Sequence, residues 1–442
     1  MPPAETIALE SESARRQDAE RDVRPWAWVP SLYLAMGTPM ITVSVVAAIM
    51  YKNLGLSNAE IALYTGSMYL PWVLKPLWAP LLELVWTKRL FVLAMEFAIA
   101  LGLGALGLAL ELPSYLAATI TIFWIIGFAS ATQDIAADGV YIAAMNPKQQ
   151  AQFVGVQGIA WNAGRLLASG LLVECTYWLH AQRRLSWQKT WSWVMFALAL
   201  VMVALGLWHT RSLPRDAGAQ RNSSTGTSPR LAASVRTMGE TWLSFFKKPR
   251  IWLMLAVIFF YRFGEGFIEK IGPLFLMDAR SAGGLGLDNA ALGRINGSYA
   301  TVGFLSGTLL GGLFAARTGL RRSFWLLAVA LNVPHLTYFF LAVARPESQA
   351  LIATVVTLEK FGYGFGSVGH MLYMMQQVAP GLYRTAHYAF ATGIMGLCMM
   401  LTGMASGALQ QTLGYTNFFG FVLVASLPPV LLAWIAPFKG DD

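Results

Sequence analysis

The sequence predicts an all-α protein embedded in a membrane, and three features of the chain support this prediction. Of its 442 residues, 56% are hydrophobic and only 12% are charged, which is a composition typical of membrane proteins. The apolar residues form long blocks, close to the length of about 20 residues that crosses ~30 Å of hydrocarbon. The lysines and arginines between these blocks gather on alternate loops. We therefore expect a multi-pass membrane protein.

Twelve apolar blocks follow one another along the chain, and each predicts a membrane-spanning helix. The first six begin near Trp26, Ala59, Leu90, Ser114, Phe153 and Ser192, and the second six begin near Ile251, Ala290, Phe324, Gln349, Ala386 and Asn417. We therefore divide the chain into a polar tail, a six-helix half, a flexible linker, a second six-helix half and a short tail, at residues 1–25, 26–211, 212–250, 251–437 and 438–442. The first tail has neither an apolar core nor a small-residue cleavage site, so we expect no removable signal peptide.

The basic residues between the spans predict the orientation of the chain. One side holds most of them, namely Arg15, Arg16, Arg21, Arg24, Lys88, Arg89, Lys148, the group from Arg211 to Arg250, Arg317, Arg321, Arg322 and Arg384. The other side holds chiefly Lys52, Arg183, Arg184, Lys189, Arg280 and Arg345. The positive-inside rule then places both termini in the cytoplasm. The net charge of +9 follows from this topology, or from a basic surface that faces anionic lipid, and requires no nucleic acid.

The cysteines and short motifs indicate neither a metal centre nor an enzyme. Cys175 and Cys398 lie far apart in apolar surroundings, without disulfide or metal-ligand spacing. No nucleophile elbow or phosphate-binding loop stands on a suitable element. We expect no cofactor and no catalytic residue.

An internal repeat relates the two halves. "GLSNAEIALYTGSMY" begins at Gly55 and "GLDNAALGRINGSYA" begins at Gly286, each entering the second span of its half. Six positions are identical. Repeats of six helices are the architecture of the major facilitator transporters.

A basic loop after the eighth span supports the same architecture. The segment "GGLFAARTGLRR" resembles the cytoplasmic loop of that superfamily, and it predicts a gating role for Arg317, Arg321 and Arg322. Simple anchoring by positive charge is the alternative. The corresponding segment of the first half keeps Glu83, Lys88 and Arg89.

Two carboxylates follow an apolar run in the fourth span. Charges within a bilayer are costly, so each must face a cavity or a partner. Asp134 and Asp138 are four residues apart and share a helix face. Asp134 lies roughly 28 Å along its span, which matches the depth of Lys75 in the second span, so these two can pair. Asp138 either takes part in gating or caps the cytoplasmic edge.

The seventh span carries the densest group of charges. In "FFYRFGEGFIEKIG", Arg262 and Glu265 are three residues apart, and Glu265 and Glu269 are four apart. We expect Arg262 and Glu265 to form an ion pair within the helix, either as part of a site or as a structural contact.

Four other spans contain isolated ionisable side chains. Glu359 and Lys360 lie near the middle of the tenth span. Arg165 in the fifth span either meets an anionic solute or forms an internal salt bridge. Glu96 has no partner nearby in sequence, and His335 follows Pro334 at a predicted kink, where a hydrogen-bonded structural role is favoured.

Together these segments resemble the AmpG-like permeases and the related acetyl-CoA transporters, a branch of the major facilitator superfamily. The resemblance rests on "LPWVLKPLWAPLLE", "SATQDIAADG", "YRFGEGF" and "EKFGYGFGS" on the second, fourth, seventh and tenth spans. It implies the major facilitator fold, with twelve helices in two halves, and proton-driven uptake of GlcNAc-anhydromuramyl peptides across the cell inner membrane. Family members carry an aromatic-arginine pair early in the fifth span, where this chain has Trp161 and Asn162, with Arg165 one turn later.

The leading hypothesis is a secondary transporter that works as a monomer with a small amphipathic or anionic solute and protons. Asp134, Glu265 or Glu359 would carry the proton, and Arg262, Arg165 and Lys75 would hold the solute. The same fold carrying an acyl-CoA or a siderophore is one alternative. A membrane sensor that transports nothing is another.

Overall fold

The computed structural model describes residues 24–85, 87–145, 147–215, 239–381 and 384–438, and these residues are helical apart from short turns. The tail 1–23, the linker segment 216–238 and residues 439–442 lie outside the described residues, as do the predictions made for them.

The first half consists of six helical rods in sequence order. The first rod is α2 (Pro25–Ile41), the π-helix η1 (Thr42–Val46) and α3 (Ala47–Asn53), and the second is α4 (Asn58–Ser67) and α5 (Leu70–Val85). Next come α6 (Lys88–Ala109) and α7 (Tyr115–Ala144). The fifth rod is α8 (Pro147–Arg165), η2 (Leu166–Leu171), α9 (Leu172–Tyr177) and η3 (Trp178–Gln182), and the sixth is α10 (Trp187–Ser212).

The second half repeats this order. It contains α12 (Ile251–Phe260) and α13 (Phe263–Met277), the short η4 (Arg280–Ala282), then α14 (Asn289–Leu292), η5 (Gly293–Tyr299) and α15 (Ala300–Thr318). These are followed by α16 (Leu320–Asn332), η6 (Val333–His335), α17 (Leu336–Ala344), α18 (Gln349–Tyr373) and η7 (Met374–Val378). The last helices are α19 (Arg384–Ala425) and α20 (Leu427–Trp434), and Gly414 breaks α19 with a φ of 71°.

Eight of the described helices are long and apolar enough to cross a membrane. One of them, Ala386–Trp434, contains the break at Gly414 and covers the last two predicted spans. The spans predicted near Ala59, Phe153 and Gln349 are also helical but are not among the eight. The number twelve therefore stays a prediction.

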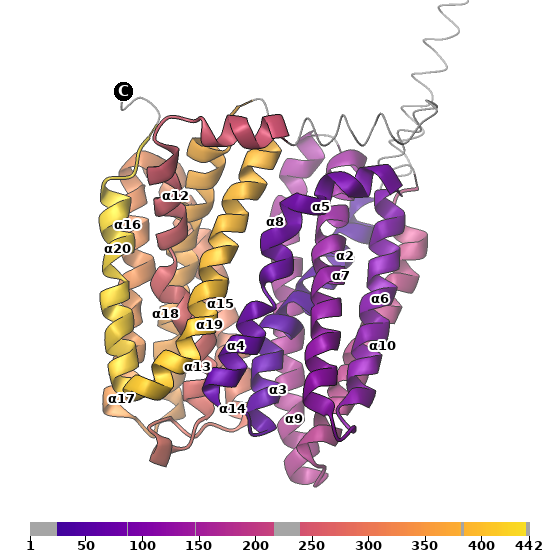
Figure 1. The fold of residues 1–442 in the computed structure, drawn as a ribbon, viewed down its shortest axis with the longest axis vertical. Coiled ribbons are helices and arrows are strands. Elements are labelled where there is room, and N and C mark those ends of the chain that lie inside the picture. The colour runs from indigo at the N-terminus through magenta and orange to yellow at the C-terminus, as the bar shows by residue number, and fades with distance from the viewer. Residues whose placement is uncertain (1–23, 86, 146, 216–238, 382–383, 439–442) are drawn as a thin grey trace, which may run out of the picture.

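The rods run alternately up and down, so their loops gather at two ends (Figure 1). We call the end with the loops 54–57 and 278–288 the outer end, because the basic residues predict that it faces away from the cytoplasm. In Figure 1 the outer end is at the bottom, where α3, α9, α14 and α17 lie. The opposite end is called the inner end.

The internal repeat builds two equivalent contacts between the halves. Ser57 and Asp288 occupy the same repeat position, and each caps the helix that follows by accepting a backbone N–H bond. Gly66 and Gly297 are also equivalent. A Cβ atom on Gly66 would lie 2.8 Å from a backbone nitrogen of α19, and one on Gly297 would lie 2.3 Å from the carbonyl oxygen of Ser169 in η2. Glycine is required at both positions because the backbones of the two halves approach so closely.

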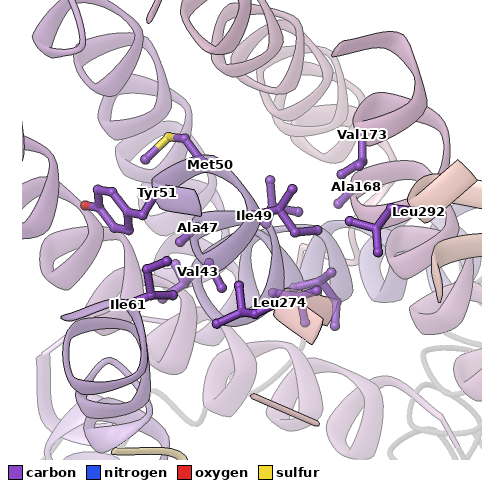
Figure 2. Close-up of a cluster of buried hydrophobic side chains, with 14 of the residues drawn as sticks. Val43, Ala47, Ile49, Met50, Tyr51, Ile61, Ala168, Val173, Leu274 and Leu292 are labelled. Atoms are coloured by element: carbon purple, nitrogen blue, oxygen red, sulfur yellow. The ribbon is translucent and has the colours of Figure 1, made fainter. Parts of the chain in front are cut away.

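A buried apolar core joins the halves toward the outer end (Figure 2). Leu274 and Leu292 of the second half lie in one cluster with residues of the first half, namely Val43, Ala47, Ile49, Met50, Tyr51, Ile61, Ala168 and Val173. This shared core, which we call the outer plug, holds the two halves together at this end.

Candidate functional site

The centre of the bundle contains an ion-pair network between α13 and α18. The ammonium of Lys360 lies 2.8 Å from a carboxylate oxygen of Glu265 and 3.0 Å from one of Glu269. Glu269 also accepts a hydrogen bond from Arg165 at 3.2 Å. Arg165 ends α8 in the first half and Glu269 lies in the second, so the network crosses between the halves. The internal salt bridge considered for Arg165 is therefore present.

A buried histidine and a second glutamate extend this network. His335 contacts Ser426 at 2.7 Å and Glu265 at 3.3 Å, and its side chain is fully buried, which confirms a hydrogen-bonded histidine near the kink at Pro334. Glu359 lies 3.3 Å from Lys360, and neither of its carboxylate oxygens has a hydrogen-bond partner among the described residues. Like charges in a dry site repel strongly, so Glu359 is the least stabilised carboxylate of the group.

Glu265, His335 and Glu359 could also be considered as metal ligands. Their potential ligand atoms lie within 4.8 Å of one another. The ammonium of Lys360 already contacts both carboxylates and supplies the positive charge. A cation would have to displace this ammonium, so we assign no metal to the cluster.

The predicted ion pair between Arg262 and Glu265 is wrong. Arg262 instead donates a hydrogen bond to the hydroxyl of Tyr363 and lies over its ring, 4.8 Å from the centroid. The helix is interrupted at Tyr261 and Arg262, where Arg262 has a φ of −114° and precedes α13. The three-residue spacing therefore does not place the two side chains on one helix face. Arg262 points toward α18 and its guanidinium remains without a carboxylate partner among the described residues.

A second group of charges lies within the first half. Lys75 of α5 forms an ion pair with Asp134 of α7, which confirms the pair predicted from their depth. Asp138, one turn further along α7, accepts a hydrogen bond from the hydroxyl of Tyr33 at 2.8 Å, and Gln157 donates to that hydroxyl at 2.7 Å. Asp138 therefore ties together three helices of this half.

The three arginines expected to take part in gating lie away from the two groups of charges described above. Arg317, Arg321 and Arg322 are exposed, at the turn between α15 and α16 at the inner end. They are not part of either charged group described above. Their gating role stays a prediction.

Glu96, whose role the sequence left open, lies in a network of hydrogen-bonded side chains and is itself fully buried. Both of its carboxylate oxygens contact Nδ1 of His209, at 2.7 and 2.9 Å, and Gln133 donates to it at 3.2 Å. The Nε2 atom of His209 contacts Ser31 at 2.9 Å. These four side chains come from α6, α10, α7 and α2, so the network joins four helices of the first half.

The equivalent asparagines of the repeat hold the halves together at the outer end. Asn58 donates to Gln410 of α19 at 2.8 Å, and Asn289 donates to Thr176 of α9 at 2.6 Å. Each bond crosses from one half to the other. Lys52 and Asp278 add an ion pair of 2.5 Å across the same end. The repeated sequence thus forms two related cross-half contacts.

Sequence reasoning assigned no role to Lys360, although this residue is the hub of the central network. Its position beside Glu359 in an apolar span was the available signal, because an intramembrane lysine requires partners. The partners on α13 are more than ninety positions away in sequence, so only the packing of α13 against α18 identifies them.

Comparison with known proteins places this site in a transporter fold. A family model described as Major Facilitator Superfamily matches residues 31–437. The chain belongs to the major facilitator superfamily. It is therefore a transporter-family protein with many passes through the inner membrane.

Several curated relatives of this superfamily member match over most of its length. The anhydromuropeptide permease of Escherichia coli K12 is 22% identical over 91% of this chain and 77% of its own. The putative transporter AmpG 4 of Rickettsia conorii is 22% identical over 91% and 94%. An uncharacterized protein of Haemophilus influenzae is 25% identical over 92% and 93%. Homologues with AmpG names thus agree with the resemblance seen in the sequence.

Solved structures support the fold. The inward open xylose transporter XylE from Escherichia coli aligns with a TM-score of 0.67 at 13% identity, over 93% of this chain and 96% of that one. The nucleoside transporter NupG aligns with a TM-score of 0.66 at 15% identity, over 92% and 96%.

Proposed function

We propose that this protein is a proton-coupled secondary transporter that takes up anhydromuropeptides, which carry carboxylates, into the cytoplasm. The cargo is suggested by the relatives named for anhydromuropeptide transport and by the resemblance of four spans to that family. The coupling is suggested by the charge balance of the central network. Asp134, Glu265 and Glu359 remain the candidate proton carriers, and Arg262, Arg165 and Lys75 the candidate cargo ligands.

The observation that carries the proposal is that, apart from His335, the central network and the neighbouring Arg262 have equal numbers of acidic and basic side chains. Its bases are Arg165, Arg262 and Lys360, and its acids are Glu265, Glu269 and Glu359. When all six are ionised and His335 carries no charge, the network is neutral and gives an anion little attraction. A proton on one glutamate leaves a net charge of +1, so proton binding and anion binding favour each other.

Glu359 is the favoured proton carrier of the three candidates. Its oxygens accept no hydrogen bond among the described residues, whereas those of Glu265 face both Lys360 and His335. Hydrogen bonds and nearby cations favour the ionised form of a carboxylate. Arg262 is the favoured anion ligand, because its guanidinium can offer two parallel donors to a carboxylate.

Uptake into proteoliposomes tests this function. Labelled GlcNAc-anhydromuramyl tripeptide should accumulate when the outside is acidic and should only equilibrate without a pH gradient. Glu359→Gln should abolish accumulation but retain counterflow exchange, which needs no net proton movement. Accumulation in wild-type protein without any proton gradient would refute the coupling. Failure to transport the muropeptide, with uptake of an acyl-CoA or siderophore instead, would refute the cargo.

A further inference from the structure

Lys270 is a buried lysine outside the central network. It follows Glu269 on α13, and only 6% of its surface is exposed. Its ammonium donates to the hydroxyl of Thr65 in α4 at 2.8 Å and to the carbonyl oxygen of Ser44 in η1 at 3.2 Å. No carboxylate of the described residues lies within salt-bridge distance of it. Burying a cation that is held only by neutral oxygens costs free energy. Such a residue is therefore a candidate for a functional role.

Both partners of Lys270 belong to the opposite half of the protein. Thr65 and Ser44 lie in the first half, and Lys270 lies in the second. Alternating access in this superfamily moves the halves against each other. Opening of the outer end therefore has to separate the ammonium from both acceptors. Ser44 also lies in a π-helical segment, a feature that often marks functional positions in helices.

Most residues of the outer plug lie between Lys270 and the outer end, and the same apolar cluster also continues inward past Lys270 to Ile268 and Met68. Leu274 is one turn beyond Lys270 toward the outer end, and Ile61 is one turn beyond Thr65 in the same direction. Figure 2 shows Leu274 and Ile61 within the plug, together with Val43, the neighbour of Ser44. In the present structure the plug separates Lys270 from the outer end. When the plug opens, the ammonium becomes the first buried charge beneath it.

We infer that Lys270 forms an anion-binding subsite for carboxylate groups that is available only when the outer end is open. This inference rests on the proposed function and adds a second contact for the same cargo. When the outer end opens, Lys270 loses its hydrogen bonds to Thr65 and Ser44. An anion that enters from outside then binds the ammonium in their place. Closure of the outer end returns Lys270 to Thr65 and Ser44, which releases the anion. Arg262 lies about 12 Å further inward along the seventh span, at 1.5 Å per residue, and can receive it.

A test that needs no cargo measures the electrostatic potential at this position. In a Cys175→Ser, Cys398→Ser background, Thr65→Cys provides a reporter thiol beside Lys270. An anionic and a cationic methanethiosulfonate of similar size are applied from the outer side. The ratio of the anionic to the cationic rate should fall on the order of tenfold in Lys270→Gln, as expected for the loss of one charge at contact distance in a hydrated cavity.

Two further variants control for general effects on the fold and surface. Lys270→Arg keeps the charge and should keep the ratio. Lys189→Gln removes an exposed lysine at the outer end and should leave the ratio unchanged. If the ratio of the anionic to the cationic rate is the same with Lys270 present and in Lys270→Gln, the inference is overturned. Failure of both reagents to reach Thr65→Cys from outside would also overturn it.

Uptake kinetics separate this inference from the proposed function. Lys270→Gln should raise the KM of the labelled muropeptide on the order of tenfold, and should raise the KM of its carboxamide derivative much less. Equal increases for both would contradict an anion subsite. If wild-type protein transports neither compound, the proposed cargo is wrong, whereas the reagent ratio still decides whether Lys270 attracts anions.

Discussion

Removal of the Glu96 carboxylate should strongly destabilise the first half of the protein. Glu96→Ala leaves Nδ1 of His209 and the amide of Gln133 without their buried partner. Both side chains of the Glu96–His209 pair are fully buried. Each orphaned buried polar group costs about 1–3 kcal/mol, and Glu96→Ala orphans two of them, so we expect a loss of about 3–5 kcal/mol.

The melting temperature of the purified protein in detergent measures this loss. For a unit of 150–250 residues, 1 kcal/mol corresponds to about 2–4 °C, so Glu96→Ala should lower the melting temperature by about 6–20 °C. The double variant Glu96→Leu, His209→Leu should recover much of the loss, because both buried polar partners are replaced by apolar groups. Ser31 keeps its bond to the carbonyl oxygen of Trp28 in that variant.

An exposed glutamate provides the matched control. Glu111 is exposed and follows the outer end of α6, and Glu111→Ala should change the melting temperature by less than about 2 °C, as surface substitutions usually do. A similarly small change in Glu96→Ala would refute the reasoning, because the carboxylate would then contribute no net stabilisation. A double variant less stable than Glu96→Ala would show that His209 does not depend on the carboxylate.

Three further predictions concern transport. If the Lys75–Asp134 ion pair only holds the inner end closed, Asp134→Asn and Lys75→Met should each impair uptake, and the double variant should recover it. If Asp134 instead carries the proton, Asp134→Asn should lose accumulation and keep only counterflow exchange. Full activity in Asp134→Asn would reject both roles. Arg262→Lys should lower cargo affinity about tenfold or more, because an ammonium cannot replace the planar contact with an anion, and equilibrium binding with wild-type affinity would exclude the assigned role. Gly297→Ala should abolish most uptake, because its Cβ would lie 2.3 Å from a backbone oxygen of η2. Gly155→Ala is the control and should retain uptake, because no atom lies within 4 Å of the added Cβ. Equal uptake rates in these two variants would contradict the close contact.

The sequence could predict contacts whose geometry follows from regular helices. The depth of Lys75 and Asp134 in their spans predicted their ion pair, because 1.5 Å per residue holds in both helices. The repeat at Gly55 and Gly286 predicted two related halves, and the structure shows its glycines at related contacts. Periodicity is sufficient where a helix is straight and its partner lies at the same depth.

The central network could be predicted only in part. Arg262 and Glu265 were assigned to one face, but the chain departs from helical geometry at Arg262, which no residue pattern in "FFYRFGEGF" indicates. The partner of Glu96 is 113 positions away, so no local spacing could identify His209. Lys270 was visible in the sequence, but its two neutral acceptors belong to other helices. Long-range side-chain partners depend on helix packing that one sequence does not reveal.

The break at Gly414 has a consequence for membrane insertion. The φ of 71° at this residue lets the chain reverse between two helical stretches without a polar loop. The residues around the turn, from Gln411 to Phe418, carry no lysine, arginine, aspartate or glutamate. This turn therefore gives the insertion machinery no charge signal of its own. The two stretches should enter the bilayer together as one helical hairpin, with their orientation set by Arg384, the first residue of α19.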